Sequence, residues 1–206
     1  MSVINFQSKN FQSKNFRSDV RSLLRERLLD AAQGITVESG WTAVTMAKIA
    51  DLAGVSRQTV YNEFGSKPEL ADELVMRELG RFLDVVSTRL LAHDDVVIGL
   101  ESACEGALTL AQSNPLLKAV LDSVYNGESD LLPLLTTESQ GLIDTATSSV
   151  TQIIGEHYGD IGLTDAQLQA ATDAIVRLVL SHVMRPAVPP VEAAAQIAWI
   201  AGKVLG

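Results

Sequence analysis

The chain has 206 residues, of which 47% are hydrophobic, and this length and composition predict a globular protein of one or two modest domains. No segment reaches the roughly 18 apolar residues that a membrane-spanning helix needs, and the N-terminus lacks the apolar core of a secretory signal. We therefore expect a cytoplasmic protein that does not enter a membrane.

Charge is distributed unevenly along the chain. The overall net charge of −9 is unfavourable for a protein that binds nucleic acid. Residues 1–67, however, hold nine Lys/Arg and six Asp/Glu, a net charge of +3, whereas residues 68–206 hold seven and nineteen, a net charge of −12. This asymmetry indicates a DNA-facing end on an acidic body that phosphate repels, although an acidic surface also serves solubility alone.

The residue types that build metal and catalytic sites are few. Cys104 is the single cysteine and the three histidines lie far apart in the sequence, so we expect neither a metal nor a cofactor. A helical enzyme would need convergent nucleophile and acid–base groups, which this pattern does not supply, and we expect no enzyme. We interpret Cys104 as a small buried core residue, with a disulfide between subunits as the alternative.

Residues 1–18 contain a repeat of five residues, Asn5-Phe-Gln-Ser-Lys9, which recurs at Asn10 and, in part, at Asn15. A period of five matches neither a helix nor a strand, and apolar residues are few, so the sequence predicts a flexible basic N-terminal arm. Either this arm adds phosphate or minor-groove contacts, or it is a tail without a role. The residues that would make such contacts are Lys9, Lys14, Arg17 and Arg21.

A first helix is predicted from Ser18 to Ser39, because its apolar residues recur at helical spacing. Trp41 follows it and is expected to fill a small core with the next two helices. The apolar positions of this first helix are Leu24, Leu28, Ala31 and Ile35.

Residues 45–64 predict two short helices joined by a tight turn. Thr45 can cap the first helix, Gly54 lies where a helix commonly ends in a left-handed residue, and Ser56 can cap the second helix. Apolar residues four apart give each helix an inward face. This is the geometry of a helix-turn-helix that reads DNA. The inward pairs are Ile49 with Ala53 and Val60 with Phe64.

The second short helix has a polar outer face suited to base edges and phosphates. Ser66 and Glu69 then form a capping box that opens a third helix, which places Lys67 at a helix N-terminus where a phosphate binds well. The predicted DNA-binding residues are Thr45, Ser56, Arg57, Gln58, Thr59, Tyr61, Asn62 and Lys67.

Over about residues 20–70 the chain resembles the TetR family of bacterial transcriptional regulators, on some ten positions that agree in type and spacing. Glu63 is a departure, since many members carry tyrosine or histidine directly before the phenylalanine. Phosphate would repel a carboxylate there, so that backbone contact is not carried over. The matching residues are Thr45, Ile49, Ala50, Ala53, Gly54, Val55, Ser56, Thr59, Tyr61, Phe64, Lys67 and Leu70, preceded by Gly40 and Trp41.

The remaining chain shows helical spacing without an alternating strand pattern, so the fold class is predicted to be all-α. The predicted domains are the arm at 1–18, a helix-turn-helix DNA-binding domain at 19–67, and a helical ligand-binding and dimerisation domain at 68–206. The body helices are expected at about Lys67–Leu91, Asp94–Ser113, Pro115–Tyr125, Ser129–Tyr158, Thr164–Met184 and Val191–Val204.

The last two helices predict a homodimer contact. The helix after Thr164 is apolar around more than half its circumference, and the last helix carries small residues that let a partner helix approach closely. The alternative is that both helices are interior to one subunit. The predicted interface residues are Ile175, Val179, Ala194, Ala198, Trp199 and Ala201.

The resemblance implies a small-molecule pocket among the middle helices. The composition, with 5% aromatic residues, favours a mainly apolar effector such as a fatty acyl compound, a hydrophobic drug or a degradation intermediate. Each candidate lining residue also fits a core position. The candidates are Phe82, Cys104, Leu108, Leu121, Tyr125 and His182.

Together these features predict a homodimeric repressor that places residues 56–64 of each subunit in successive major grooves of a near-palindromic operator. An effector would release it by favouring a state in which the two reading heads are separated differently. A ligand-independent DNA-binding protein or an activator shares the N-terminal pattern and stays an alternative.

Overall fold

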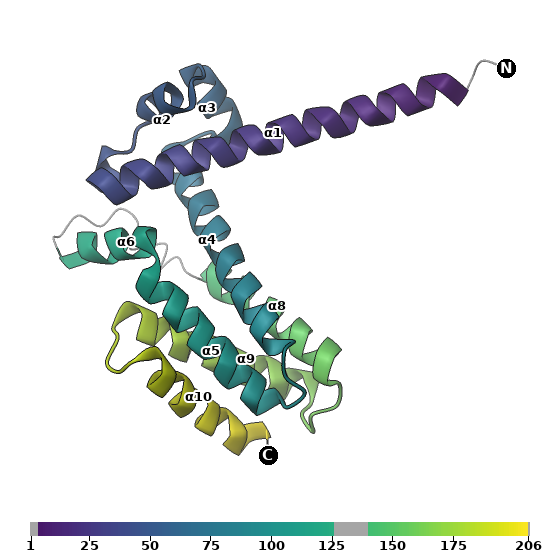
Figure 1. Cartoon of the computed structure of the whole chain (residues 1–206), viewed down its shortest axis with the longest axis vertical. Helices are drawn as coiled ribbons and strands as arrows, with labels where there is room; N and C mark the ends of the chain where they lie inside the picture. Colours follow the sequence, from purple (N-terminus) through teal and green to yellow (C-terminus); the bar gives the residue numbers. More distant parts are fainter. Residues whose placement is uncertain (1–3, 126–139, 206) are drawn as a thin grey trace. The chain divides into compact units, whose positions relative to one another are not determined.

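The computed structural model describes residues 4–125 and 140–205, and within these ranges the regular elements are all helices (Figure 1). The all-α prediction is confirmed. The chain divides into two compact units, residues 1–74 and 75–206. The predicted boundary after Lys67 lies seven residues before this division, because the first two turns of the following helix bury Leu70, Ala71 and Leu74.

The first unit contains three α-helices, a short 3-10 helix and the start of a fourth α-helix. Its core gathers buried side chains from every one of these elements, including Leu28, Trp41 and Val60. The predicted role of Trp41 in this core is confirmed, since it is 6% exposed. The elements are α1 (Ile4–Ser39), η1 (Trp41–Ala43), α2 (Met46–Ala53), α3 (Arg57–Phe64) and α4 (Lys67–Leu90).

The structure differs from the sequence prediction at the N-terminus. Residues 4–18, predicted as a flexible arm, are helical and continue α1 without a break to Ser39. No glycine or proline occurs between Ile4 and Gln33, and extending a nucleated helix costs far less than starting one. A five-residue repeat therefore does not prevent a helix that a packed neighbouring segment has already nucleated.

Local capping places the short helices of this unit as the sequence predicts. Thr45 Oγ1 accepts a hydrogen bond from the Lys48 amide at 3.2 Å, and Ser56 Oγ accepts one from the Thr59 amide at 3.1 Å. Gly54 ends α2 in the left-handed conformation, with φ of 67°. A side chain at this position would be strained, which is why glycine makes the tight turn.

Within residues 75–125 and 140–205, the second unit contains the rest of α4 and five further helices. Asp95 caps the first of them through the amides of Val97 and Ile98, and Thr164 with Gln167 forms the predicted capping box. The part of the expected helix from Ser129 to residue 139 lies outside the described residues. The helices are α5 (Val96–Ser113), α6 (Pro115–Tyr125), α8 (Gln140–Tyr158), α9 (Asp165–Met184) and α10 (Pro190–Leu205).

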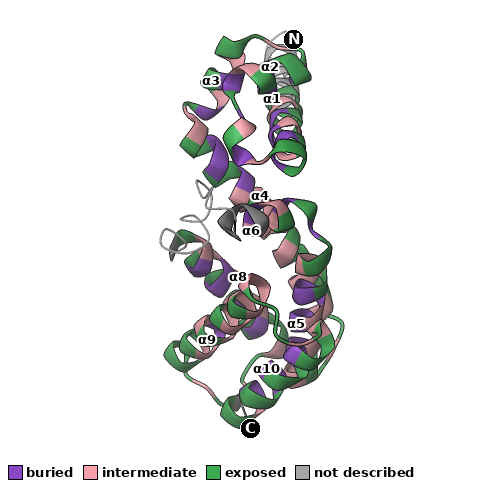
Figure 2. Ribbon diagram, turned by 90° about the vertical axis from the view of Figure 1, so that its left-hand side faces the viewer, coloured by how far each residue is buried: buried purple, intermediate pink, exposed green. Residues whose placement is uncertain are grey.

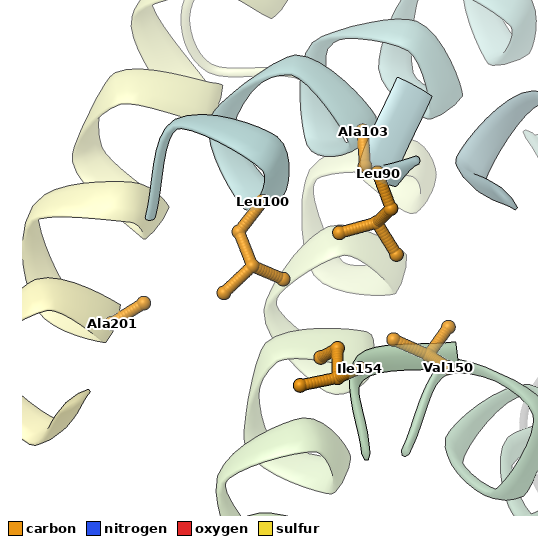
Figure 3. Close-up of a cluster of buried hydrophobic side chains, with 6 residues drawn as sticks. All are labelled: Leu90, Leu100, Ala103, Val150, Ile154 and Ala201. Carbon is orange, nitrogen blue, oxygen red and sulfur yellow. The ribbon is translucent and has the colours of Figure 1, made fainter. Parts of the chain in front are cut away.

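Helix α5 is central to the second unit, because it packs extensively against α10 and also contacts α9 (Figure 1). A buried apolar cluster joins α4, α5, α8 and α10 (Figure 3). Small residues such as Ala103 and Ala201 in this cluster allow the helices to approach closely. The cluster consists of Leu90, Leu100, Ala103, Val150, Ile154 and Ala201.

Candidate nucleic-acid interface

Helix α3 presents the polar outer face that the sequence predicts. Val60 and Phe64 are 0% and 4% exposed and anchor the helix to the core. Thr59 is half-buried beside its cap, and its hydroxyl lies 2.8 Å from that of Ser56. The exposed side chains of the helix are Arg57, Gln58, Tyr61 and Asn62.

The exposed side chains of α3 form two pairs one helical turn apart. Arg57 Nη2 lies 3.4 Å from the Tyr61 hydroxyl, and its guanidinium carbon lies 5.6 Å from the centroid of the Tyr61 ring. Gln58 Nε2 donates to Asn62 Oδ1 at 2.9 Å. Pairs at this spacing restrict the side chains before any ligand arrives, which lowers the entropic cost of binding.

Lys67 begins α4 as predicted, but its ammonium group already has partners. Nζ donates to the Trp41 carbonyl at 3.0 Å and lies 5.1 Å from the centroid of the Trp41 ring. The side chain is half-buried. A phosphate at this helix N-terminus would therefore share Lys67 with Trp41, and the phosphate contact stays a prediction.

Glu63 has a role that the sequence did not predict. Its side chain is only 11% exposed and accepts hydrogen bonds from Arg21, while its carbonyl accepts one from Arg25. Arg21, predicted to belong to a free basic arm, is thus paired within the fold. Glu63 and Arg21 are 42 residues apart, so no local pattern marks the pair.

The second unit contains a cavity of about 470 Å³ between α5, α6, α9, the start of α10 and the segment that joins α9 to α10. Three of the six predicted pocket residues, Leu108, Leu121 and His182, lie in its wall. The other lining residues are Ala111, Gln112, Lys118, Val183, Met184, Pro186, Val188, Pro190 and Ala193.

Two of the remaining pocket candidates, Phe82 and Cys104, do not lie in this wall. Phe82 is half-buried on α4, and Tyr125 ends α6, with its side chain outside the described residues. Cys104 is 4% exposed and packs with Ala194 and Ile197. Burial, assisted by the negative charge of Glu101, raises the pKa of the Cys104 thiol to about 12. The structure therefore supports the interpretation of Cys104 as a core residue.

The predicted dimer residues divide into two groups. Ala194, Ala198 and Ala201 are at most 3% exposed, which removes them from any partner's reach and corrects that part of the prediction. Their small side chains serve the close packing of α10 on α5 within one chain. Ile175 and Val179 are half-buried and pack against this same core.

Trp199, by contrast, is 67% exposed, and α10 shows buried and exposed residues alternating along its length (Figure 2). Ile200, which the sequence also places in the expected dimer contact, is exposed as well. The sequence prediction did not include two further exposed apolar residues of this helix, Val191 and Val204.

No helix of residues 4–125 and 140–205 is long and apolar enough to cross a membrane. Within those same ranges, no three side chains of the types His, Cys, Asp or Glu gather closely enough to hold a metal ion.

Comparison with known proteins identifies the family. Residues 28–74 match the family model of bacterial regulatory proteins of the TetR family, and residues 95–203 match the model of the bacterial tetracyclin repressor C-terminal domain. The second match alone spans more than half of the chain. Both units are therefore covered by models of one family.

Named relatives agree with these matches. The chain is 33% identical over 183 residues to the HTH-type transcriptional regulator AlkX of Mycobacterium tuberculosis, covering 86% of this chain and 83% of the relative. It is 36% identical over 136 residues to the HTH-type transcriptional activator FasR of Mycolicibacterium smegmatis, covering 66% and 60%.

A solved structure extends the likeness to the whole fold. The TetR family repressor AlkX from Dietzia sp. strain DQ12-45-1b, implicated in biodegradation of n-alkanes, superposes with a TM-score of 0.71 at 27% identity, covering 87% of this chain and 94% of that one. The capped helix pair with its exposed polar face, the helical body and these matches agree. The chain belongs to the TetR family of bacterial transcriptional regulators.

Proposed function

We propose that the protein is a homodimeric repressor that binds a near-palindromic operator through α3 and leaves it when a mainly apolar molecule binds the second unit. The observation that carries the proposal is the outer face of α3. Its four exposed polar side chains are ordered in pairs on a helix whose start is capped and whose inner face is buried. Arginine, glutamine and asparagine are the side chains that make bidentate contacts with base edges.

A homodimer is proposed because a single helix of this size contacts few base pairs. Two copies related by a twofold axis read two half-sites about one helical turn apart, which raises both affinity and specificity. The exposed apolar residues of α10 supply a self-complementary contact surface, with Trp199 as its largest side chain. Aromatic anchors of this kind dominate the energetics of interfaces.

The proposed effector site is the cavity of about 470 Å³, a volume within the usual range of small-molecule sites. Aliphatic and proline side chains form most of its wall, and Gln112, Lys118 and His182 add polar groups. This combination suits an aliphatic chain with a polar or anionic end. The relative implicated in n-alkane biodegradation supports the same class, so we propose a fatty acyl compound or a related alkane derivative.

The test is selection of bound duplexes from random DNA, followed by release measurements. We expect a twofold-symmetric consensus with half-sites about one helical turn apart. A long-chain fatty acid should then weaken operator binding, whereas a short-chain acid of equal charge should not. Absence of any sequence preference would refute the operator proposal, and equal effects of both acids would refute the aliphatic effector.

One relative is named as a transcriptional activator, so activation of transcription is the alternative to repression. Transcription in vitro from a promoter carrying the selected site distinguishes the two. A repressor lowers transcript yield and the long-chain acid restores it. An increase in transcript yield on adding the protein would establish activation instead.

A further inference from the structure

We propose that Arg21 binds a phosphate of the DNA backbone and that Glu63 is the positioning residue that aims it. This inference deepens the proposed DNA-binding function and rests on it. It explains why an acidic residue, Glu63, is present on the reading helix, although its negative charge alone would weaken binding to DNA.

The contact between these residues fixes one part of the guanidinium and leaves another part outside the pair. Arg21 Nε donates to Glu63 Oε1 at 3.1 Å and to Oε2 at 2.9 Å. A guanidinium has five N–H donors, so this contact does not use the four on Nη1 and Nη2. The Arg21 side chain is 66% exposed, whereas that of Glu63 is 11% exposed. The carboxylate is thus an inner anchor and the arginine is the outward-facing group.

A second arginine holds the anchor itself in place. Arg25, one turn after Arg21 on α1, donates from Nη1 to the Glu63 carbonyl at 2.9 Å. Its Nη2 lies 2.6 Å from Glu73 Oε1 on α4, and its guanidinium carbon lies 4.6 Å from the centroid of the Phe64 ring. Arg25 therefore links α1, α3 and α4, and it fixes the backbone from which the Glu63 carboxylate projects.

The location of Arg21 matches that of a phosphate-binding group. A reading helix in the major groove has the two sugar–phosphate backbones along its flanks. Glu63 follows the exposed Asn62 in the last turn of α3, so the guanidinium it holds lies beside the reading face. Arginine binds phosphate through two parallel N–H groups, which is the part of Arg21 that the carboxylate does not engage.

The stability of the fold gives little reason for this pair. An ion pair with one partner largely exposed contributes little to the free energy of folding. Its geometric effect is larger, because it removes the rotamer freedom that a long arginine side chain would otherwise lose on binding DNA. In a chain of carboxylate, guanidinium and phosphate, the arginine donates hydrogen bonds to both anions through different N–H groups.

The experiment measures binding to a random-sequence duplex across a series of salt concentrations, because a phosphate contact is independent of base sequence. The variants are Glu63→Gln, Arg21→Ala and the double variant in the full chain. Asp51→Asn is the matched control, since Asp51 is an exposed acid on α2 of the same unit. Circular dichroism and thermal melting verify the fold of each variant.

The change in DNA affinity expected for Glu63→Gln is opposite to the change that loss of a negative charge alone would cause. Asp51→Asn leaves binding unchanged or slightly tighter, because it removes a repulsive charge. Glu63→Gln removes the same charge yet weakens binding about threefold, since the arginine is no longer held. Arg21→Ala weakens binding about five- to tenfold and lowers the salt slope by about 0.9 for each bound subunit. In the Arg21→Ala background, Glu63→Gln causes no further loss.

Two outcomes would overturn the inference. One is tighter binding by Glu63→Gln, as in the control; the other is an unchanged salt slope in Arg21→Ala. Because Arg21 is exposed, its alanine variant keeps the fold even if Glu63→Gln does not, and its salt slope alone decides the phosphate contact. Failure of the unaltered protein to bind any duplex would instead contradict the proposed function.

Discussion

The two units of this chain build their candidate sites in different ways. In the first unit, the polar face of α3 is ordered by contacts within four residues, such as the pair Gln58 and Asn62. In the second unit, the cavity and the apolar surface of α10 depend on helices that are distant in sequence, such as α5 packed on α10. A site ordered by contacts between residues close in sequence can be predicted from the sequence. A site formed by the packing of distant helices can be identified only in the structure.

Helix α10 illustrates the second case. Small residues on a helix indicate that another helix approaches closely, but they do not identify which helix. Here that neighbour is α5 of the same chain, so Ala194 and Ala201 are buried without a partner subunit. The exposed Trp199 lies on the remaining surface of the same helix, which is the surface that we propose for contact with a second copy.

The largest expected effect tests whether packing holds the second unit together. Leu90→Ala should lower the free energy of unfolding by about 2–5 kcal/mol, because Leu90 is 0% exposed in the apolar cluster of Figure 3 and alanine leaves a cavity there. Leu91→Ala is the control, since Leu91 is 50% exposed and its change should stay within about 0.5 kcal/mol. Similar denaturation midpoints for the two variants would contradict the assigned core.

The next effect tests the division of α10 into an inner and an outer side. Trp199→Glu should weaken the homodimer by at least about 2 kcal/mol, because a charge replaces an aromatic anchor on both sides of the twofold axis. Sedimentation at several protein concentrations measures this. Leu52→Glu, at a similarly exposed position in the first unit, should leave the dimer intact. Equal dissociation by both variants would show that the α10 surface is not the contact.

Some features of the two units could be predicted from the sequence and others could not. The caps Thr45 and Ser56 and the left-handed Gly54 set the helix-turn-helix because each acts within one turn of the chain. The pair Arg21 and Glu63 was missed because 42 residues separate its members and any of several charges could have been the partner. Cavity residues such as Leu108 were predicted together with core residues such as Cys104, since apolar spacing does not distinguish the wall of a cavity from a core.

The DNA-reading face of the first unit is tested by Arg57→Ala. The free energy of binding to the selected operator should become less favourable by about 1–3 kcal/mol, because the bidentate contact with the edge of one base is lost. Binding to random DNA should change much less. Equal losses on operator and random duplexes would refute the base-reading role of Arg57.

Lys67→Ala is the contrasting variant, since its predicted phosphate contact carries no sequence information. We expect weaker binding to all duplexes and a lower salt slope. Because Lys67 Nζ also donates to the Trp41 carbonyl, the thermal stability of this variant must be measured beside its affinity. A loss confined to the operator would contradict the predicted phosphate contact.

A smaller effect tests the local order of α3. Ser56→Ala should lower the stability of the helix-turn-helix by about 1 kcal/mol, because the Thr59 amide loses its side-chain acceptor. Ser22→Ala, at an exposed position within α1, is the control and should have almost no effect. Hydrogen exchange of the amides in α3 measures the difference. Unchanged protection in Ser56→Ala would mean that packing of Val60 and Phe64 alone holds the helix.

The last prediction concerns the Cys104 thiol, a titratable group that packing buries in the second unit. Burial raises the pKa of the Cys104 thiol from its ordinary value of 9.0 to about 12. Between these values the unfolded chain releases a proton that the folded chain keeps, so the stabilising contribution is complete below pH 9.0 and declines as the pH rises. The unfolding free energy of the unaltered protein, relative to Cys104→Ala, should therefore fall by about 1 kcal/mol between pH 8 and pH 10. A difference independent of pH would show that the thiol reaches solvent in the folded state, and the assignment of α5 and α10 as closely packed at Cys104 would have to be abandoned.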